Sequence, residues 1–204
     1  MKDLAETTAE GRLRLHFHPG QARAWESDRR FVVVLAGTQG GKTSFGPYWL
    51  WREMQRRGPG DYMVVTPTYP LLIKKALPEF LRLFDRHLRL GSRRDESGYN
   101  TQQKVYALSA DGQARTHGAA SPDTPTKVFF GHASDPESLE SATAKAVWLD
   151  EAGQRKFRLD SWEALQRRLS IHQGRALVTT TPYDLGWLKQ KLWDPWNAAG
   201  GRTR

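Results

Sequence analysis

The sequence predicts a single domain of the α/β class, built on a mainly parallel central β-sheet that is flanked by helices. Short apolar runs rich in β-branched residues alternate with longer amphipathic runs, a pattern typical of strands separated by helices. The length of 204 residues fits one domain, and eight Trp and eight Phe can fill a core although only 38% of the residues are hydrophobic. We expect residues 1–204 to form this domain, with 1–15 as an N-terminal extension and 188–204 as a C-terminal linker or tail.

Hydrophobic periodicity places the individual elements. Apolar and β-branched runs predict strands at 31–35, 62–66, 105–108, 128–130, 146–149 and 176–180. Amphipathic spacing predicts helices at 43–57, 78–90 and 160–169. The helix at 160–169 is expected to turn three side chains towards the core, those of Trp162, Leu165 and Leu169. The helix at 78–90 has Pro78 in its first turn, where the missing N–H costs little.

The composition excludes several classes of protein. Lys and Arg number 31 against 22 Asp and Glu, so the net charge is +9, which is compatible with a nucleic acid or another anionic partner. Cys is absent, which excludes a disulfide scaffold, a thiolate nucleophile and a Cys-ligated metal site. No apolar run reaches the length of about 18 residues that spans a membrane. Residues 1–10 also lack the apolar segment of a secretory signal, so we expect no membrane partner.

A glycine-rich segment follows the first predicted strand and opens the first long helix. It reads Ala36-Gly37-Thr38-Gln39-Gly40-Gly41-Lys42-Thr43, which matches the phosphate-loop (Walker A) pattern with Ala36 in place of the first glycine. The glycines let backbone N–H groups turn towards phosphate oxygens. Lys42 would reach the β- and γ-phosphates, and the Thr43 hydroxyl can ligate Mg²⁺. We expect ATP to bind to Gly37, Thr38, Gln39, Gly40, Gly41, Lys42, Thr43 and Ser44.

The predicted strand at 146–149 ends in two carboxylates, Asp150 and Glu151, in the manner of a Walker B motif. The tip of the strand would place Asp150 beside the phosphate loop, where it can hold Mg²⁺ together with Thr43. Glu151 is expected to point towards the attacking water and act as the general base. The loop and the carboxylates together predict a P-loop NTPase fold with Mg²⁺-dependent ATP hydrolysis, in which Lys42 and Glu151 are catalytic.

These motifs resemble those of the ATPase domain of the large terminase subunit, the DNA-packaging motor of tailed phages. The resemblance rests first on the phosphate loop and on Leu149-Asp150-Glu151-Ala152. Three further segments are similar to family motifs in the same order: His18-Pro19-Gly20-Gln21, Val64-Val65-Thr66-Pro67-Thr68-Tyr69 and Val178-Thr179-Thr180-Thr181-Pro182. The similarity extends over residues 16–187, nearly the whole chain.

The resemblance implies a RecA-like translocase that uses ATP hydrolysis to move double-stranded viral DNA into a procapsid. It implies that Gln21 hydrogen-bonds the adenine edge, and that a coupling motif relays the γ-phosphate state to DNA-contacting segments through Thr179, Thr180 and Thr181. It also implies a homo-oligomeric ring on the phage portal protein, assembled from monomers, with the small terminase subunit as a further partner. The expected location is the host cytoplasm and, transiently, the procapsid portal.

The sequence departs from the family at the arginines that usually stabilise the transition state. Thr38 stands where many terminases have an arginine in the phosphate loop, and the segment 138–141 before the acidic strand contains none. The possible replacements follow the acidic pair: Arg155, Arg158, Arg167 and Arg168. We favour Arg168, acting on the nucleotide of a neighbouring subunit, because its helix leads directly into the coupling strand. Arg155 and Arg158 are the alternatives.

Two other functions stay open at this point. One is a helicase-like nucleic-acid-dependent ATPase, although helicases normally need a second RecA-like domain, which 204 residues cannot hold. The other is a nucleotide-gated DNA-binding or assembly module with little turnover. Full terminases continue into a nuclease domain with an acidic metal cluster. Asp184 and Asp194 are too few to supply that cluster, so we expect the nuclease domain to be absent and no DNA cleavage by this chain.

Two surfaces are candidates for contact with DNA. The first is the basic face of the helix at 78–90, where Arg82, Arg86 and Arg89 have the spacing of one helical face, or the loop that follows it. The second is a set of tryptophans near the C-terminus that could stack on bases: Trp187, Trp193 and Trp196. For these tryptophans we expect packing in a core or an interface instead.

Overall fold

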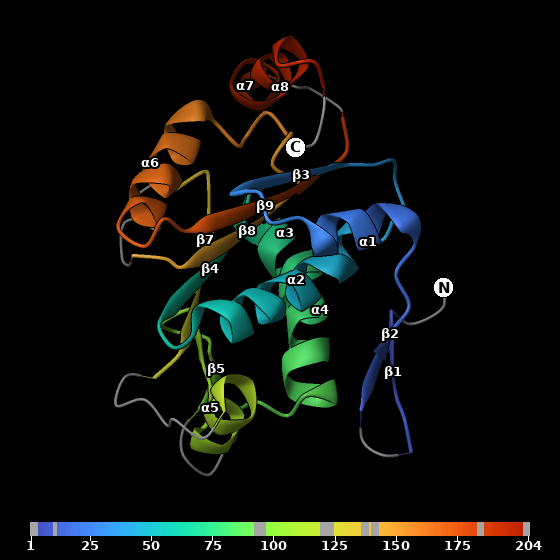
Figure 1. Ribbon diagram of the computed structural model, residues 1–204. Coiled ribbons are helices and arrows are strands. Elements are labelled where there is room, and N and C mark those ends of the chain that lie inside the picture. Colours follow the sequence, from blue (N-terminus) through green and yellow to red (C-terminus); the bar gives the residue numbers. More distant parts are fainter. Residues whose placement is uncertain are drawn as a thin grey trace.

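The computed structural model describes residues 4–9, 12–91, 97–118, 125–135, 139, 143–182 and 186–201 (Figure 1). The strands are β1 (Ala5–Thr7), β2 (Leu13–Leu15), β3 (Phe31–Leu35), β4 (Asp61–Thr66), β5 (Gly98–Asn100), β6 (Val105–Ala107), β7 (Lys127–His132), β8 (Ala146–Asp150) and β9 (Arg175–Thr180). The longer helices are α1 (Pro19–Glu26), α2 (Lys42–Arg57), α5 (Ala110–His117) and α6 (Leu159–Ser170). Two composite helices are α3 (Tyr69–Leu71) with η1 (Leu72–Ala76), α4 (Leu77–Leu81) and η2 (Arg82–His87), and α7 (Gly186–Leu188) with η4 (Lys189–Trp193) and α8 (Asp194–Ala198).

A seven-stranded sheet in the order β3-β9-β8-β4-β7-β6-β5 forms the centre of the molecule. The five strands from β3 to β7 are parallel, and β6 and β5 extend the sheet as an antiparallel hairpin. The expected α/β class is therefore confirmed. Each expected strand is present, with ends that differ by at most two residues. Because the parallel strands all point the same way, the turns after β3, β4, β7, β8 and β9 lie along one edge, here called the carboxyl edge.

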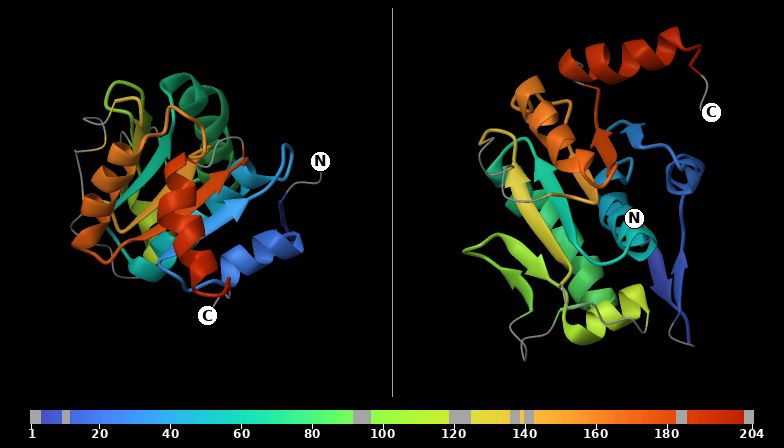
Figure 2. Two further views of the ribbon diagram at one scale, coloured as in Figure 1. Left: turned by 90° about the horizontal axis from the view of Figure 1, so that it is seen from above. Right: turned by 60° about the vertical axis from the view of Figure 1, so that its left-hand side comes forward.

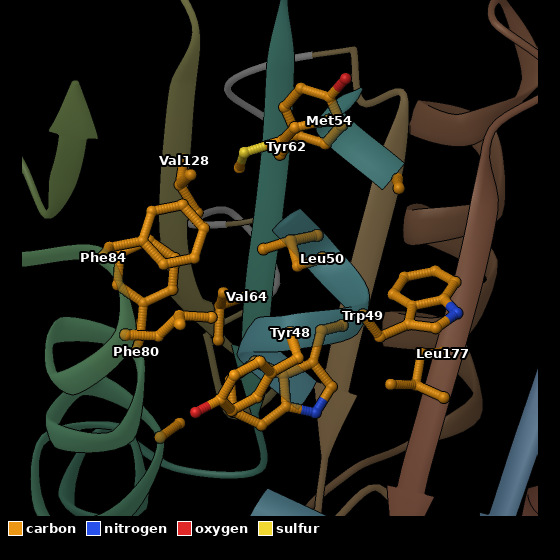
Figure 3. Packing of buried hydrophobic residues seen from close by; sticks show 14 of the residues in the cluster. Tyr48, Trp49, Leu50, Met54, Tyr62, Val64, Phe80, Phe84, Val128 and Leu177 are labelled. Atoms are coloured by element: carbon orange, nitrogen blue, oxygen red, sulfur yellow. The ribbon is translucent and has the colours of Figure 1, made fainter. Parts of the chain in front are cut away.

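Hydrophobic cores lie on both faces of the sheet, because successive residues of a buried strand point to opposite sides. On one face Tyr62 and Val64 of β4 lie in the core formed with α2 and the helix from α3 to η2 (Figure 3). On the other face Met63 and Val65 of the same strand lie in the core formed with α6. The side chains of α6 that were expected to face the core are buried: Trp162, Leu165 and Leu169.

The helix expected at 78–90 begins earlier and ends earlier than predicted. Helical structure runs from Tyr69 to His87, with Pro78 inside it. Pro78 has no N–H to donate to the carbonyl one turn back, which breaks the regular ladder. The Leu77 N–H donates to the Leu72 carbonyl five residues earlier, so the turn just before the proline is the wider turn of a π-helix. The sequence pattern predicted that the helix begins at Pro78, because a π-helical turn leaves no clear signature in the spacing of hydrophobic residues.

The expected basic face of that helix is not formed as predicted. Arg89 lies beyond the helix in the left-handed region, with φ of +50°. Arg82 pairs with Glu79 at 2.7 Å on the preceding turn. Three arginines at helical spacing therefore do not line one face, which weakens the case for this helix as the DNA-contacting surface.

The two ends of the chain both carry regular structure. β1 and β2 form an antiparallel hairpin in which Ala5 is buried and Leu13 packs against the core of the α2 face. The C-terminal composite helix lies at the top of Figure 1, beyond α6. Its Trp187 stacks on Trp162 with ring centroids 5.1 Å apart, as expected for core packing. Trp193 and Trp196 contact each other and are about 40% exposed, so these two do not pack in the core, and their packing in an interface stays a prediction. Among the described residues no helix is both long and apolar enough to cross a membrane.

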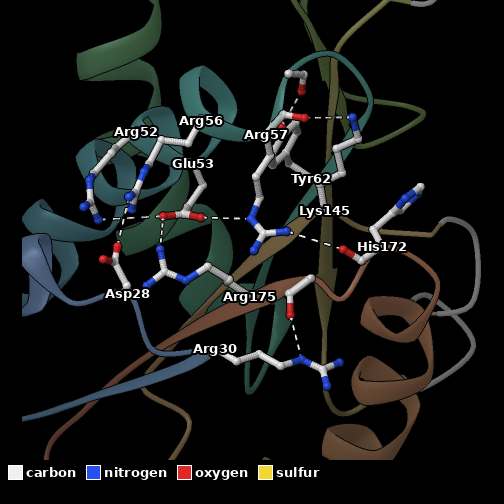
Figure 4. Close-up of polar contacts among 12 residues, drawn as sticks. Asp28, Arg30, Arg52, Glu53, Arg56, Arg57, Tyr62, Lys145, His172 and Arg175 are labelled. Carbon is white, nitrogen blue, oxygen red and sulfur yellow. Dashed lines mark hydrogen bonds and ion pairs between the residues drawn. The ribbon is translucent and has the colours of Figure 1, made fainter. Parts of the chain in front are cut away.

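An ion network fixes the opposite edge of the sheet, here called the amino edge (Figure 4). Glu53 of α2 is buried and pairs with Arg175, the first residue of β9. Arg57 donates to the other Glu53 oxygen at 3.1 Å. Arg175 also donates to the Arg29 carbonyl at 2.9 Å, which ties in the turn before β3. The phosphate-loop helix and β9 are thus joined at this edge by a fully compensated buried carboxylate.

Candidate active site

The phosphate loop is the turn between β3 and α2 at the carboxyl edge. Gln39 and Gly41 both lie in the left-handed region, with φ of +64° and +67°. Left-handed residues within such a loop let neighbouring backbone N–H groups converge on an anion at the start of a helix. Lys42, the first residue of α2, is buried, and its Nζ donates to the carbonyls of Ala36 at 2.9 Å and Gly37 at 2.7 Å. The ammonium group therefore lies across the loop that would hold phosphates.

The remaining predicted nucleotide-binding residues lie at the exposed tip of the loop, within the loop or in the first turn of α2. Gly37, Thr38 and Gln39 are exposed at the tip of the loop, and Ser44 is buried in the first turn of α2. Gly40 packs closely inside the loop, because a Cβ there would lie 3.1 Å from that of Ala36. The small side chain of Ala36 is thus compatible with the tight turn, as expected for the residue that replaces the first glycine.

Asp150, the last residue of β8, receives hydrogen bonds from two threonines. Thr43 Oγ1 donates to Oδ2 at 3.0 Å and Thr179 Oγ1 donates to Oδ1 at 2.8 Å. Burial raises the pKa of Asp150 to about 6, although the Thr179 and Thr43 hydrogen bonds act to lower it. The neighbouring Glu151 adds to the rise, and the charge of Lys75 opposes it. Among the residues that the structure describes, this buried carboxylate accepts hydrogen bonds from neutral hydroxyls and forms no ion pair.

Sheet order explains why these residues meet. β9 lies between β3 and β8, so the end of the predicted coupling strand falls between the phosphate loop and the acidic strand. In the register of the pair, Asp150 lies opposite Thr179. Trp148 Nε1 donates to Thr179 Oγ1 at 2.9 Å and so fixes the hydroxyl that contacts Asp150. The role of Trp148 could not be found from the sequence, where it is one aromatic residue in an apolar run.

Glu151 is held in an unusual backbone conformation for a non-glycine residue, with φ of +56°. The side chain is 8% exposed, and among the described residues its Oε2 is buried without a hydrogen-bond partner. A buried carboxylate oxygen without a donor is costly unless water, a ligand or a cation meets it. The Asp150 carboxylate and the Thr43 hydroxyl, which are in contact, are hard oxygen donors of the kind that Mg²⁺ prefers. The residues present therefore fit this cation.

The other two coupling residues connect β9 to the segment after the acidic pair. Thr180 Oγ1 accepts the Gly153 N–H at 2.9 Å and donates to the Thr181 carbonyl at 3.1 Å. The Thr180 carbonyl accepts the Ala36 N–H at 3.2 Å. Thr180 thus joins the start of the phosphate loop to the turn that follows Glu151.

Gln21 is buried beside the phosphate loop, and both ends of its amide are engaged. Oε1 accepts the His18 N–H at 3.2 Å, and Nε2 donates to the Gly41 carbonyl at 3.2 Å. In this arrangement Gln21 supports the loop, and reading an adenine edge would require it to exchange one of these bonds. His18 is a second support that the sequence analysis missed. It caps α1, and its Nε2 lies 3.4 Å from the Gly40 carbonyl.

The structure separates the candidate arginines into two groups. Arg155 and Arg158 are exposed in the segment between Glu151 and α6, and Arg158 pairs with Asp160 at 2.9 Å. Arg168 lies near the far end of α6, where its carbonyl accepts the Ala144 N–H just before β8 begins. Arg168 is therefore at the amino edge, away from the site of its own chain. The same is true of its neighbour Arg167. The segment 138–141 lies outside the described residues except for Leu139.

A phosphate loop after one parallel strand and paired carboxylates after another, with a further strand between them, define a P-loop NTPase fold. The structure of the Thermus phage P74-26 large terminase ATPase domain agrees with this chain at a TM-score of 0.62, with 21% identity over 86% of this chain and 69% of that one. The large terminase of the thermophilic bacteriophage D6E agrees at a TM-score of 0.68, with 13% identity over 90% of this chain and 44% of that one. These similarities show the fold.

Sequence similarity points the same way. The chain is 28% identical over 172 residues to the terminase large subunits of Thermus phage G20c and Thermus virus P23-45. The matched region covers 83% of this chain and 34% of each relative, so the chain spans about a third of their length. No family profile matches it. The expected resemblance to the ATPase domain of large terminases is thus confirmed by sequence and fold.

Proposed function

We propose that this chain is an ATPase domain of a phage DNA-packaging motor, in which Mg²⁺-dependent ATP hydrolysis drives translocation of double-stranded DNA. The observation that carries the proposal is the convergence of Thr43 and Thr179 on Asp150. Through these two hydrogen bonds the phosphate loop, the acidic strand and the coupling strand meet at one buried carboxylate. Structures of the related D6E large terminase in complex with ADP and with ATP-γ-S add support for nucleotide binding by this fold.

In the proposed reaction, each group at the carboxyl edge has one task. Backbone N–H groups of the phosphate loop and the Lys42 ammonium bind the phosphates and offset the charge that develops on them. Thr43 and Asp150 would hold Mg²⁺, which when bound neutralises phosphate charge and fixes the geometry of the phosphates. Glu151, with an unpartnered Oε2, accepts the proton of the attacking water. An arginine from a neighbouring subunit would complete the site, and the candidates are Arg168, Arg155 and Arg158, of which Arg155 and Arg158 are exposed.

The coupling step is proposed to pass through Thr180. Because its hydroxyl connects β9 to Gly153, a change at the γ-phosphate that moves Glu151 or Thr179 also moves the segment carrying Arg155. That segment is exposed and can reach a neighbouring subunit or DNA. We accordingly propose that residues 1–204 act as one ATPase domain within a homo-oligomeric ring on the portal protein, with double-stranded DNA and the small terminase subunit as partners.

The direct test is Mg-ATP hydrolysis per subunit measured as the protein concentration rises. We expect specific activity to climb as neighbours complete the site, and to disappear in Glu151→Gln. Glu163→Gln, which makes the same change on the exposed face of α6, is the matched control and should behave as the wild type. Hydrolysis that Glu151→Gln leaves unchanged would contradict the proposal.

The same preparation distinguishes the two alternatives. A helicase-like ATPase would separate the strands of a forked duplex in an ATP-dependent manner, whereas a packaging motor would not. A nucleotide-gated module would bind Mg-ATP tightly and show hydrolysis no higher than Glu151→Gln at every protein concentration. Either result would replace the proposed function.

A further inference from the structure

An exposed tyrosine and three lysines lie on the segments next to the ends of β4 and β7 at the carboxyl edge. Tyr69 opens the helix that follows β4, and its side chain is 41% exposed. The Nζ of Lys104 lies 4.9 Å from the centroid of the Tyr69 ring. Lys74 and Lys75 are exposed on η1, within two turns of Tyr69. We call Tyr69, Lys74, Lys75 and Lys104 the lysine cluster.

The fold holds Lys104 in place from both its backbone and its side chain. Lys104 ends the turn between β5 and β6, in a hairpin that projects from the sheet (Figure 2). Its backbone is in the left-handed region, with φ of +54°, and its carbonyl accepts the Phe130 N–H at 2.9 Å. The Tyr69 ring attracts the ammonium through its negative face and is itself packed edge-on against His132 at 5.9 Å. A lysine held in this way loses less conformational entropy when it binds an anion than a free surface lysine does.

The charge of the cluster is not neutralised within the part of the chain that the structure describes. None of its three lysines forms an ion pair with a described carboxylate. Burial and the charge of Lys104 lower the pKa of His132, and the nearby carboxylate of Asp135 opposes this shift. The charge of Lys75 reaches Asp150. The cluster is therefore a positively charged surface that adjoins the proposed nucleotide site.

We propose that the lysine cluster is a contact surface for the phosphodiester backbone of duplex DNA, an inference that rests on the proposed function. Phosphate groups attract ammonium groups such as those of Lys74, Lys75 and Lys104, and such contacts position a duplex without reading its sequence. The Tyr69 hydroxyl can donate to a phosphate oxygen beside Lys104. Because the helix that carries Tyr69, Lys74 and Lys75 begins directly after β4, next to β8, the surface lies where a nucleotide-dependent movement would reach the DNA.

The test is the salt dependence of duplex binding by the full chain, measured by fluorescence anisotropy with a labelled DNA duplex. Each phosphate contact contributes about 0.9 to the slope of log Kd against log salt, so Lys104→Ala should lower the slope by about that amount. Lys127→Ala removes the same charge at the amino end of the adjacent β7 and should leave the slope unchanged. Tyr69→Ala, which removes the ring under Lys104, should weaken binding, and Tyr69→Phe should restore most of it.

Two outcomes would overturn the inference. Equal slopes and affinities for Lys104→Ala, Lys127→Ala and the wild type would exclude the cluster as a DNA contact. A wild type that binds no duplex would do the same, and capture of an acidic protein by the cluster would then be the competing explanation. DNA-independent ATP hydrolysis, measured in parallel, tests the proposed function separately. Lys104→Ala should retain this activity. Failure of the wild type to hydrolyse ATP would refute the proposed function, whereas the salt dependence of DNA binding would still decide whether the lysine cluster contacts DNA.

Discussion

Each of the two edges of the sheet contains one fully buried carboxylate, and the two carboxylates are stabilised by different kinds of contact. Asp150 at the carboxyl edge and Glu53 at the amino edge are both 1% exposed. Asp150 receives hydrogen bonds from the neutral hydroxyls of Thr43 and Thr179, and its pKa is raised to about 6. Glu53 is paired with the guanidinium of Arg175 and bonded by that of Arg57.

This difference separates a structural carboxylate from one available for chemistry. Both carboxylates connect α2 to β9, since Thr43 and Glu53 lie at opposite ends of α2, and Thr179 and Arg175 at opposite ends of β9. At the amino edge the counter-charge is built into the protein, so the contact persists whatever is bound. At the carboxyl edge no described residue forms an ion pair with Asp150, which leaves room for the counter-charge that a Mg-nucleotide would bring. The fold thus has one fixed end and one end that can respond to a ligand.

The largest expected effect is a loss of stability on breaking the Glu53 ion pair at the amino edge. Glu53→Gln leaves the Arg175 guanidinium buried beside a neutral group, and loss of one partner of a buried ion pair costs about 3–5 kcal/mol in free energy of unfolding. Chemical denaturation monitored by circular dichroism measures this loss. The double variant Glu53→Met/Arg175→Leu should recover much of it, because a packed apolar pair needs no counter-charge. A single variant as stable as the wild type would show that the network is not a clamp.

The next largest effect concerns hydrolysis at the responsive end. Asp150→Asn keeps the shape of the side chain but removes the negative charge proposed to hold Mg²⁺. We expect the rate of Mg-ATP hydrolysis to fall by about 10²–10³-fold, the cost typical of losing one preorganised electrostatic contact. The free energy of unfolding should not fall, in contrast to Glu53→Gln. Hydrolysis at the wild-type rate, measured by phosphate release, would remove Asp150 from the site.

The raised pKa of Asp150 predicts a pH dependence of stability with a definite sign. Below its ordinary pKa of 3.8 the carboxyl is protonated in both folded and unfolded chains. Between 3.8 and about 6 the unfolded chain ionises while the folded chain retains the proton, so stability falls as the pH rises. A shift of this size corresponds to about 3 kcal/mol at most, reached above pH 6. Denaturation of metal-free protein across this range should show the fall in the wild type and lose that component in Asp150→Asn.

The smallest expected effect is on the support of the phosphate loop. Removing the His18 cap of α1 by His18→Ala should cost about 1 kcal/mol of stability, as is usual for an N-cap. Because the same ring contacts the Gly40 carbonyl, ATP affinity should also fall. His18→Asn keeps a capping group but is too short to reach Gly40, so it should restore stability more than affinity. Equal recovery of both quantities, by calorimetry, would show that the contact with the loop has no role.

Local sequence signals predicted the elements whose formation depends mainly on their own residues. The strand at 31–35, for example, follows from a β-branched run, and the start of α2 from the loop before it. The predicted bounds of the helix at 78–90 were wrong because the π-helical turn before Pro78, which lets the helix start at Tyr69, has no spacing signature. Pairings across the fold were also beyond reach: Glu53 and Arg175 are 122 positions apart, and no local pattern marks them as partners.

The candidate site shows the same division. Motif spacing predicted that the phosphate loop and Asp150 would serve one function, and the resemblance to terminases added Thr179. The sheet order β3-β9-β8 supplies the reason they are adjacent. The sequence could not show that Gln21 supports the loop, because that depends on which partners its amide finds. Nor could it show that Arg168 lies at the amino edge, since a helix that leads into a strand can carry its residues at either end.

The most direct test of the contrast between the two edges is the Mg²⁺ dependence of ATP binding, measured by isothermal titration calorimetry. The account predicts that wild-type protein binds ATP more tightly with Mg²⁺ than with chelator present, and that Asp150→Asn, still folded, shows no such difference. Lys104→Ala, which leaves both carboxylates intact, should retain the full difference. An equal Mg²⁺ effect in the wild type and Asp150→Asn would contradict the claim that Asp150 is the carboxylate kept for an external cation.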